Sequence, residues 1–286
     1  MSATINLEKK HFPVLLDEII KIISPQYSGT FLDCTFGQGG YSEKILENSK
    51  NKVIAFDRDS NAIKLSERFK KHFKDRFEFN HKKFSEIKNI NSKNIKAIIF
   101  DLGYSTDQIF DEEKGLSFNS KGTLNMKIGL NQFSAHEAIN KLDKEDLTKI
   151  FKFFGDEKDA KKISQAIFRK RNNHILKTED LVEIINKEKK NYNFKINKST
   201  KIFQSLRIFV NQEISELIFG LINAYKLLPV NGYIVVVTFH SLEDRIVKFF
   251  FKNYSEDKKV SRYLPSSKNE NKIFEVLNKK VIIPST

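Results

Sequence analysis

The stretches Thr30-Phe-Leu-Asp-Cys-Thr-Phe-Gly-Gln-Gly-Gly-Tyr-Ser42 and Val53-Ile-Ala-Phe-Asp-Arg-Asp59 carry the strongest structural signal in this chain. They predict a strand, a glycine loop, a helix and a second strand that ends in a carboxylate. This order is typical of a nucleoside-cofactor site in an open α/β sheet. Asp57 follows the loop's three glycines by 17 to 20 residues. That spacing suits a carboxylate that accepts hydrogen bonds from two ribose hydroxyls.

The glycine loop carries Gly37, Gly39 and Gly40 and reads G-x-G-G-Y-S. A dinucleotide-binding fingerprint, G-x-G-x-x-G, requires a third glycine at position 42, where this chain has Ser42. A nucleoside cofactor without phosphates, such as S-adenosylmethionine, therefore fits better. The alternative is a plain turn between strand and helix with an exposed aspartate. It ranks second, because three glycines in four positions exceed what a turn needs.

The composition is that of a globular protein of 286 residues, 40% of them hydrophobic, with one cysteine, Cys34. This length allows one large core, or a core and a smaller domain. A lone cysteine supports no disulfide framework and suits a reducing compartment. No apolar run approaches the roughly 20 residues of a membrane-spanning helix, and the N-terminus lacks the apolar segment of a signal peptide. We therefore expect a cytoplasmic protein that does not enter a membrane.

The formal net charge of +14 is spread evenly along the chain. Residues 1–105 carry a net +5, residues 106–198 a net +4 and residues 199–286 a net +5. A basic balance permits a nucleic-acid partner. Because no segment concentrates the charge, the balance alone does not demonstrate one.

Strands and helices alternate in the first and last thirds of the chain, which predicts an α/β fold with a doubly wound, mostly parallel sheet. We expect strands at residues 30–36, 52–56, 76–80, 95–102 and 232–239, with late strands at 272–276 and 280–283. We expect helices at 13–23, 42–48, 60–73, 199–228 and 241–253. Residues 106–198 show no convincing strand but contain capped helices, one of them opened by the capping box of Ser134 and Glu137. The predicted domains are a sheet domain, 1–105 with 199–286, and a helical insert, 106–198.

Polar side chains gather at the carboxyl ends of the predicted strands, where open α/β sheets bind ligands. These ends are the segments 33–40, 57–59, 101–106 and 238–245. Asp101 ends the most apolar strand of the chain and is followed by Gly103 and Ser105. We expect its carboxylate to lie over the sheet. A helix-capping aspartate is the alternative, which ranks lower because no helix pattern follows.

His240 allows two interpretations of equal weight, a structural histidine and a catalytic one. Ser241 and Asp244 after it suit the capping of the next helix. A Ser-His-Asp triad is not expected, because the sequence contains no G-x-S-x-G elbow. A metal site is not expected either, because the six histidines are scattered and Cys34 stands alone.

Seven segments resemble one family, the bacterial methyltransferases that modify N4 of a cytosine in the decoding region of 16S ribosomal RNA. They are His11-Phe-Pro-Val-Leu-Leu-Asp-Glu18, Asp33-Cys-Thr-Phe-Gly-Gln-Gly-Gly-Tyr-Ser42, Phe56-Asp-Arg-Asp59, Asp101-Leu-Gly-Tyr-Ser-Thr-Asp-Gln108, Gly115-Leu-Ser-Phe118, Phe203-Gln-Ser-Leu-Arg-Ile-Phe-Val-Asn-Gln-Glu213 and Phe239-His-Ser-Leu-Glu-Asp-Arg-Ile-Val-Lys248. They follow the family order from residue 11 to about residue 250, which makes the resemblance strong. The helical insert is also a family feature.

The resemblance implies the fold of the class I methyltransferases, with S-adenosylmethionine as cofactor. The implied cofactor contacts are Gly39, Gly40, Tyr41, Asp57, Phe84, Asp101 and Gln108. Phe84 would flank the adenine. The implied partner is 16S ribosomal RNA or the small ribosomal subunit, with the helical insert facing the RNA. The oligomeric state stays open, a homodimer included.

Transfer to the amine requires alignment of N4, methyl carbon and sulfur, and hydrogen-bond acceptors for the amine as positive charge develops. Asp101 or the Tyr104-Ser105 segment would supply these acceptors, so we expect Asp101 and Ser105 to be the catalytic residues. The target base must also leave its stack. RNA contacts, mostly to phosphates, are expected from Asn125, Lys127, Lys201, Arg207 and His240.

Three of this chain's motifs depart from the family pattern. The family's G-G-H becomes Gly39-Gly40-Tyr41, its D-L-G-V-S-S becomes Asp101-Leu-Gly-Tyr-Ser-Thr106, and its P-L-D-M-R becomes Thr123-Leu-Asn-Met-Lys127. Asn125 keeps an acceptor oxygen but loses the charge. Lys127 lacks the bidentate fork of arginine.

The family also continues beyond the residue that matches Pro284 with a basic segment and a last strand, whereas this sequence ends at Thr286. The strand expected near 272–283 would then lack a neighbour in the sheet. Two alternatives stay open: a methyltransferase for another RNA amine, and a non-catalytic RNA-binding protein with the same fold. The retained glycines and strand-tip carboxylates favour catalysis, whereas the altered substrate motif and the missing tail favour the non-catalytic alternative.

Overall fold

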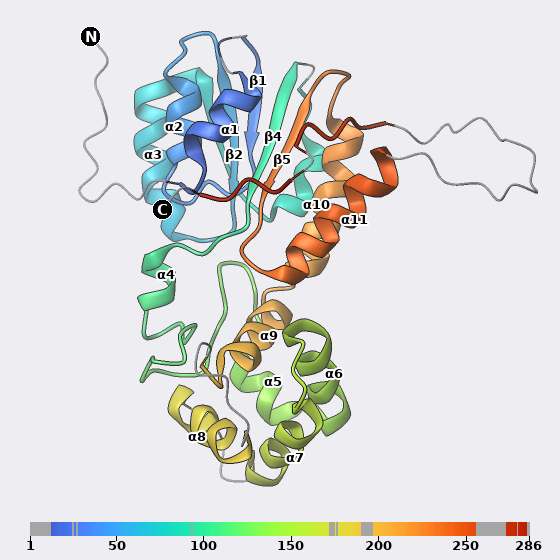
Figure 1. The fold of residues 1–286 in the computed structure, drawn as a ribbon. Helices are drawn as coiled ribbons and strands as arrows, with labels where there is room; N and C mark the ends of the chain where they lie inside the picture. Colours follow the sequence, from blue (N-terminus) through green and yellow to red (C-terminus); the bar gives the residue numbers. More distant parts are fainter. Residues whose placement is uncertain are drawn as a thin grey trace, which may run out of the picture. The chain divides into compact units, whose positions relative to one another are not determined.

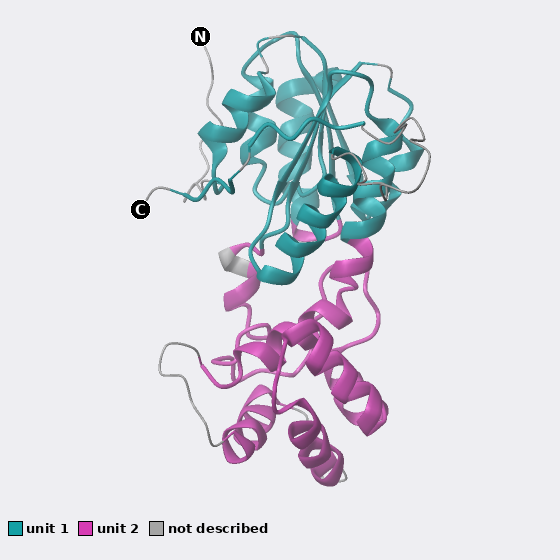
Figure 2. Ribbon diagram, turned by 45° about the vertical axis from the view of Figure 1, so that its right-hand side comes forward, with its two compact units in different colours: residues 1–57, 62–103, 217–286 teal, residues 58–61, 104–216 magenta. Residues whose placement is uncertain are grey.

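The structure is a computed structural model, and its described residues are 13–24, 26, 28–92, 94–171, 175, 177–189, 197–255, 273–278 and 280–284. The chain divides into two compact units (Figure 2). The sheet unit comprises Met1–Asp57, Ala62–Gly103 and Leu217–Thr286. The helical unit comprises Arg58–Asn61 and Tyr104–Glu216.

The sheet unit contains a five-stranded parallel sheet with the strand order β3-β2-β1-β4-β5 (Figure 1). The strands are β1 (Thr30–Asp33), β2 (Lys52–Asp57), β3 (Phe77–His81), β4 (Ile95–Asp101) and β5 (Tyr233–Val237). The apolar run of β4 lies between β1 and β5 in the sheet, and its residues from Ala97 to Phe100 are fully buried. Burial on both faces explains why this strand is continuously apolar. The predicted doubly wound parallel sheet is confirmed.

Helices cover both faces of the sheet (Figure 1). Helices α1 (Leu16–Ile23), α2 (Gly40–Leu46) and α3 (Asn61–Phe73) share one apolar core with Phe31 and Ile99. Helices α10 (Glu213–Leu227) and α11 (Ser241–Ser255) share a second core with Leu32 and Phe100. Two short 3-10 helices, η1 (Lys74–Arg76) and η2 (Phe84–Asn89), flank β3. The side chains of each strand therefore alternate between two cores.

The helical unit packs its helices around a separate apolar core. The helices around this core are α5 (Ala135–Lys141), α6 (Lys144–Gly155), α7 (Ala160–Lys170), α8 (Thr178–Glu188) and α9 (Thr200–Val210). Helix α4 (Thr106–Phe110) precedes them in the unit, with Ile109 and Phe110 exposed. Leu147, Phe151 and Leu206 are fully buried members of that core. The predicted capping box of Ser134 and Glu137 opens α5.

The helix predicted at residues 199–228 is wrong as one element, because it forms two helices, α9 and α10, separated at Asn211 and Gln212. Gln212 has a φ of 54°, in the left-handed region. The buried Asn211 carboxamide accepts from Ile128 N at 2.9 Å and donates to Met126 O at 2.8 Å. These long-range bonds hold the break. Residues 199–216, expected with the sheet, accordingly cluster with the helical unit.

The late strands predicted at 272–276 and 280–283 are also wrong. Lys272 lies outside the described residues, and the described residues of both segments form no strand. The main-chain N–H groups of Ile273 and Phe274 donate instead to the carbonyl of Tyr254 near the end of α11. The Phe274 ring packs edge-on against that of Tyr225, 5.9 Å between ring centres. Aromatic contacts and a helix end hold this segment in place of sheet pairing.

None of the helices within the described ranges is long and apolar enough to cross a membrane.

Replacing Asn211 by alanine should lower the free energy of unfolding of the helical unit. The change leaves Ile128 N–H and Met126 C=O buried without partners, and each such group costs about 1–3 kcal/mol. We expect a loss of about 2 kcal/mol or more, measured by urea denaturation. Asn119→Ala, at an exposed position of the same unit, is the control and should change stability by less than about 0.5 kcal/mol. Equal stability of the two variants would contradict this role for Asn211.

Candidate functional site

Three aspartates end neighbouring strands of the sheet unit. Asp33 ends β1, Asp57 ends β2 and Asp101 ends β4. Strand β1 lies between the other two, with Asp33 opposite Ala55 of β2 and Ile99 of β4. Because the strands are parallel, the three carboxyl ends meet at one edge of the sheet, which is where such sheets bind ligands.

The glycine turn between β1 and α2 is tied to the tip of β2. Gly37 and Gly39 have φ values of +50° and +75°, which L side chains rarely adopt. The Gly37 N–H donates to Asp57 Oδ2 at 2.7 Å. A Cβ on Gly39 or Gly40 would lie 2.6 Å or 2.3 Å from the nearest side-chain atom. The turn therefore requires glycine at these positions, for conformation or for space.

Tyr41, where the related family has histidine, has a structural role in its side chain. It is buried, and its hydroxyl donates to the main-chain oxygen of Val14, just before α1. Burial raises the pKa of the Tyr41 hydroxyl well above its ordinary value. The side chain thus anchors α2, while the Tyr41 main chain continues the glycine turn.

A hydrogen-bond network joins the tips of β1 and β4 to α2. The fully buried Asp33 accepts from Ser42 Oγ at 2.6 Å and from Thr35 N at 3.3 Å. Thr35 Oγ1 in turn accepts from Asp101 N at 2.8 Å. The strand pattern predicts Asp33 near a strand tip but does not reveal the roles of Thr35 and Ser42. Their signal is the presence of hydroxyl side chains on both sides of a glycine turn that follows a strand-ending aspartate.

Asp33 and Asp101 share a poorly solvated environment. Burial and the charge of Asp33 raise the pKa of Asp101 to about 7. Burial raises the pKa of Asp33 to about 6, although the Ser42 hydroxyl favours its ionised form. Asp101 Oδ1 is buried and has no hydrogen-bond partner among the described residues. The pKa values of both carboxyl groups therefore lie near neutrality, and Asp101 Oδ1 is an acceptor to which no described group donates.

Phe84 begins η2, on the second face of the sheet. Its ring lies edge-on to Phe100, with 5.4 Å between ring centres. A Cβ on Gly220 of α10 would lie 2.8 Å from a Phe84 ring carbon. The Phe84 ring is therefore held between β4 and α10. Its contact on β4, Phe100, is the residue before Asp101.

Ser105 and Gln108 lie in the helical unit, where they form the capping box of α4. Ser105 Oγ accepts from Gln108 N at 3.2 Å, and Gln108 Oε1 accepts from Ser105 N at 3.0 Å. A helix therefore does follow Asp101, contrary to expectation, but Ser105 caps it rather than Asp101. Periodicity does not reveal a helix of five residues.

The Gln108 side chain has a second partner, Asp59. Gln108 Nε2 donates to Asp59 Oδ2 at 2.6 Å, and Lys114 Nζ lies 3.2 Å from the same oxygen. Although burial acts to raise it, the pKa of Asp59 is lowered by these two donors. Both ends of the Gln108 carboxamide are thus engaged within the helical unit.

Asn125 and Lys127 lie in the loop that Asn211 holds. They are half-buried and alternate with the fully buried Leu124 and Met126. Asn125 Oδ1 is buried, and no described group hydrogen-bonds to it. The loop is therefore anchored by its apolar residues and carries Asn125 and Lys127 between them.

Lys201 and Arg207 have partners inside the helical unit. Lys201 Nζ donates to the main-chain oxygen of Asp156, at the end of α6, at 2.8 Å. Arg207 forms a bidentate pair with Glu213, with Nε 3.0 Å from Oε1 and a terminal nitrogen 3.1 Å from Oε2. Its guanidinium lies 4.3 Å from the ring centre of Tyr104, and the Tyr104 hydroxyl donates to Glu213. Contact of either residue with RNA stays a prediction.

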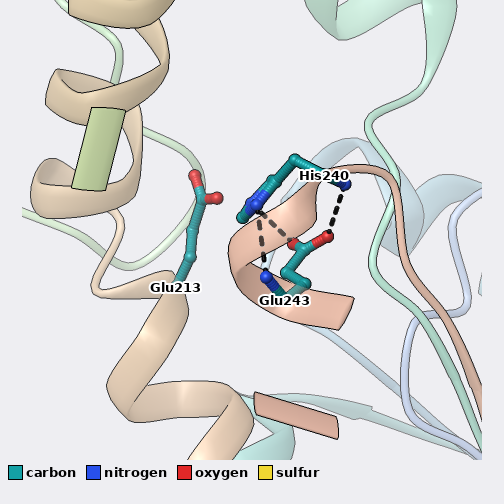
Figure 3. Close-up of side chains that lie close together, drawn as sticks. All are labelled: Glu213, His240 and Glu243. Carbon is teal, nitrogen blue, oxygen red and sulfur yellow. Dashed lines mark hydrogen bonds and ion pairs between the residues drawn. The ribbon is translucent and has the colours of Figure 1, made fainter. Parts of the chain in front are cut away.

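His240 precedes α11 in the sheet unit and forms its cap with Glu243 (Figure 3). Glu243 N donates to His240 Nδ1 at 3.3 Å, and Glu243 Oε2 accepts from the main-chain N of His240 at 3.3 Å. His240 Nε2 lies 3.1 Å from Glu243 Oε1. This reciprocal pairing is that of a capping box. His240 therefore takes the capping role that the sequence suggested for Ser241 or Asp244.

Replacing Asp33 by asparagine should lower the pKa of Asp101 from about 7 toward its ordinary value. The change removes a negative charge, while an amide oxygen can still accept from Ser42. Side-chain carbonyl NMR across a pH titration measures the shift. Asp17→Asn, at an exposed position of α1, is the control and should leave the Asp101 titration unchanged. Identical Asp101 titrations in both variants would show that Asp33 does not set this pKa.

Comparison of the sequence with known proteins shows the family of this chain. Residues 8–286 match the MraW methylase family. The chain is 39% identical over 285 residues to ribosomal RNA small subunit methyltransferase H of Rickettsia bellii, covering 98% of this chain and 93% of that protein. It is 38% identical over 278 residues to the protein of the same name from a Wolbachia of Drosophila simulans, covering 95% and 91%. The chain therefore belongs to the MraW methylase family.

Proposed function

We propose that this protein transfers a methyl group from S-adenosylmethionine to the N4 amine of a cytosine in the decoding region of 16S ribosomal RNA. The observation that carries the proposal is the network through which Asp33 joins the glycine turn to the strand tip of Asp101. Family membership supports methyl transfer. The names of the Rickettsia and Wolbachia relatives support ribosomal RNA of the small subunit as the substrate. Such a substrate would place the protein in the bacterial cytoplasm.

The proposed cofactor residues suit an adenosyl sulfonium compound. The turn at Gly39 and Gly40, with the Tyr41 main chain, follows the carboxyl end of β1, where such sheets bind ligands. Asp57 suits the ribose hydroxyls, and its bond to Gly37 keeps it beside the turn. Residues proposed to complete the site are Phe84, Asp101 and Gln108. S-adenosylmethionine, when bound, supplies a methyl group already activated by the sulfonium.

Asp101 is proposed to hold the attacking amine. The lone pair of the cytosine amine is delocalised into the ring, which makes the amine a poor nucleophile. Positive charge develops on the amine as its bond to the methyl carbon forms and the bond from that carbon to sulfur breaks. A carboxylate that accepts a hydrogen bond from the amine stabilises that positive charge. The stabilisation is stronger in a poorly solvated site. Asp101 Oδ1 is such an acceptor without a described partner. Because ionisation is required and the pKa is about 7, the transfer rate should rise as pH increases through neutrality.

Ser105 is proposed to act through the main chain of the segment that follows Asp101. Its hydroxyl caps α4, which fixes the Tyr104-Ser105 peptide as a second acceptor for the amine. RNA contacts are proposed mainly for Asn125 and Lys127, on the loop anchored by Asn211, with weaker contributions from Lys201, Arg207 and His240.

The proposal is tested with labelled S-adenosylmethionine and small ribosomal subunits from cells that lack this activity. Mass mapping of digested 16S RNA should find one N4-methylcytosine in the decoding region. Asp101→Asn should lower the rate about 100-fold or more, because it removes a preorganised charge at the developing cation. Asp17→Asn is the matched control and should react at the wild-type rate.

The other outcomes separate the alternatives. A wild-type rate in Asp101→Asn would overturn the role of Asp101. Methylation at another amine would reassign the substrate. Cofactor binding with no transfer to RNA would favour the non-catalytic RNA-binding protein.

Lys127→Ala should raise KM for the ribosomal substrate and lessen its salt dependence. Loss of one phosphate contact should reduce the slope of log KM against log salt by about 1. Lys149→Ala removes an equal charge from an exposed position of α6 and should leave the slope unchanged. Equal slopes in both variants would remove Lys127 from the RNA-binding surface.

A further inference from the structure

Phe239 lies at the same edge of the sheet as Asp101. It stands two residues after the end of β5, whose last residue, Val237, is the register partner of Asp101. The main-chain oxygen of Val237 accepts from Leu102 N at 3.1 Å. Phe239 therefore follows the tip of the strand that adjoins the proposed catalytic carboxylate.

Gly103 leaves room for the Phe239 ring. A Cβ on Gly103 would lie 2.7 Å from both Cε2 and Cζ of Phe239. Gly103 does not have the left-handed backbone that would itself require glycine. The Phe239 ring therefore explains the glycine at position 103, because it fills the space that a side chain would need. Gly103 is two residues after Asp101 in the sequence.

The main chain beneath the ring is fixed by a buried carboxylate. Glu243 is 3% exposed, and its Oε2 accepts from Phe239 N at 2.9 Å and from His240 N at 3.3 Å. His240 closes the cap (Figure 3). Two charge-assisted bonds to consecutive N–H groups hold the backbone of Phe239.

Phe239 is 51% exposed, although its backbone is fixed. A single exposed phenylalanine is ordinary on a protein surface. This one has a fixed backbone, a neighbouring glycine that makes room for it, and a position beside a buried, unpartnered acceptor. An extruded base needs a flat apolar partner and a polar group for its edge. Phe239 and Asp101 offer the two.

We propose that Phe239 is the stacking residue for the target pyrimidine, holding the ring of the base while Asp101 accepts from its amine. The proposal rests on the proposed function and adds a substrate contact that the family motifs did not assign. Stacking is indifferent to base identity, so Phe239 would contribute binding and orientation, and Asp101 would select an amine donor.

The test compares Phe239→Leu and Phe239→Tyr in steady-state methylation of small ribosomal subunits. Phe239→Leu keeps an apolar group but removes the flat face, and should lower kcat/KM by about 5- to 150-fold, the range to which base stacking energies correspond. Phe239→Tyr keeps the face and should stay within about 3-fold of wild type. Affinity for S-adenosylmethionine should be unchanged in both. Gly103→Ala should behave like Phe239→Leu, because its Cβ displaces the ring.

Phe249→Leu is the matched control, since Phe249 is 70% exposed on α11 and should tolerate the change. A second readout does not depend on catalysis: the emission of pyrrolocytosine placed at the target position of an RNA fragment. Wild-type protein and Phe239→Tyr should quench it, and Phe239→Leu should not.

Wild-type kcat/KM and quenching in Phe239→Leu would overturn the proposal, as would an equal loss in Phe239→Tyr. If wild-type protein transfers no methyl group to N4, the proposed function fails. The quenching series then still shows whether Phe239 stacks on a base.

Discussion

The buried carboxylate of Asp33 is the group on which the site depends. It is fully buried at the end of a central strand, so its two oxygens must be satisfied from within the protein. Ser42 satisfies one from the start of α2, and Thr35 satisfies the other while accepting from the main chain of Asp101. One side chain thus fixes the exit of the glycine turn and the tip of the adjoining strand. Burial raises the pKa of Asp33, and the charge of Asp33 adds to the effect of burial on the pKa of Asp101.

A similar logic organises the helical unit, with an amide in place of the carboxylate. Asn211 is buried at the break between α9 and α10, and its side chain satisfies main-chain groups of Met126 and Ile128. An uncharged group can be buried there without a shift in protonation. The loop that carries Asn125 and Lys127 is therefore held by a bond network that is insensitive to pH, unlike the acidic pair in the sheet unit.

Two departures from the family pattern, Tyr41 and Tyr104, are accommodated by packing and hydrogen bonds. Tyr41 is buried and bonded to Val14. Tyr104 donates to Glu213 and lies beneath the guanidinium of Arg207. Each substituted aromatic residue has thus acquired a polar partner for its hydroxyl, as buried tyrosines require. Both tyrosines are therefore compatible with an intact fold. Because their hydroxyls are bonded within the protein, we expect the main chain and neighbouring side chains to contact any ligand there.

Local pattern was enough to recover the parallel sheet, the strand ends at which Asp33, Asp57 and Asp101 lie, the glycine turn and the capping box of α5. These features depend on periodicity and on residues a few positions apart, such as Ser134 and Glu137. The break at Asn211, the link between Thr35 and Asp101, and the late segment near Phe274 were not recoverable. They depend on contacts between distant residues, such as those joining Asn211 to Met126 and Thr35 to Asp101, which are 85 and 66 positions apart. Apolar spacing continues unchanged across residues 199–228, because periodicity records which face is buried and not what the polar groups bond to. Polar groups far apart in the sequence meet only when the chain folds, so the tertiary structure alone decides which of them form hydrogen bonds.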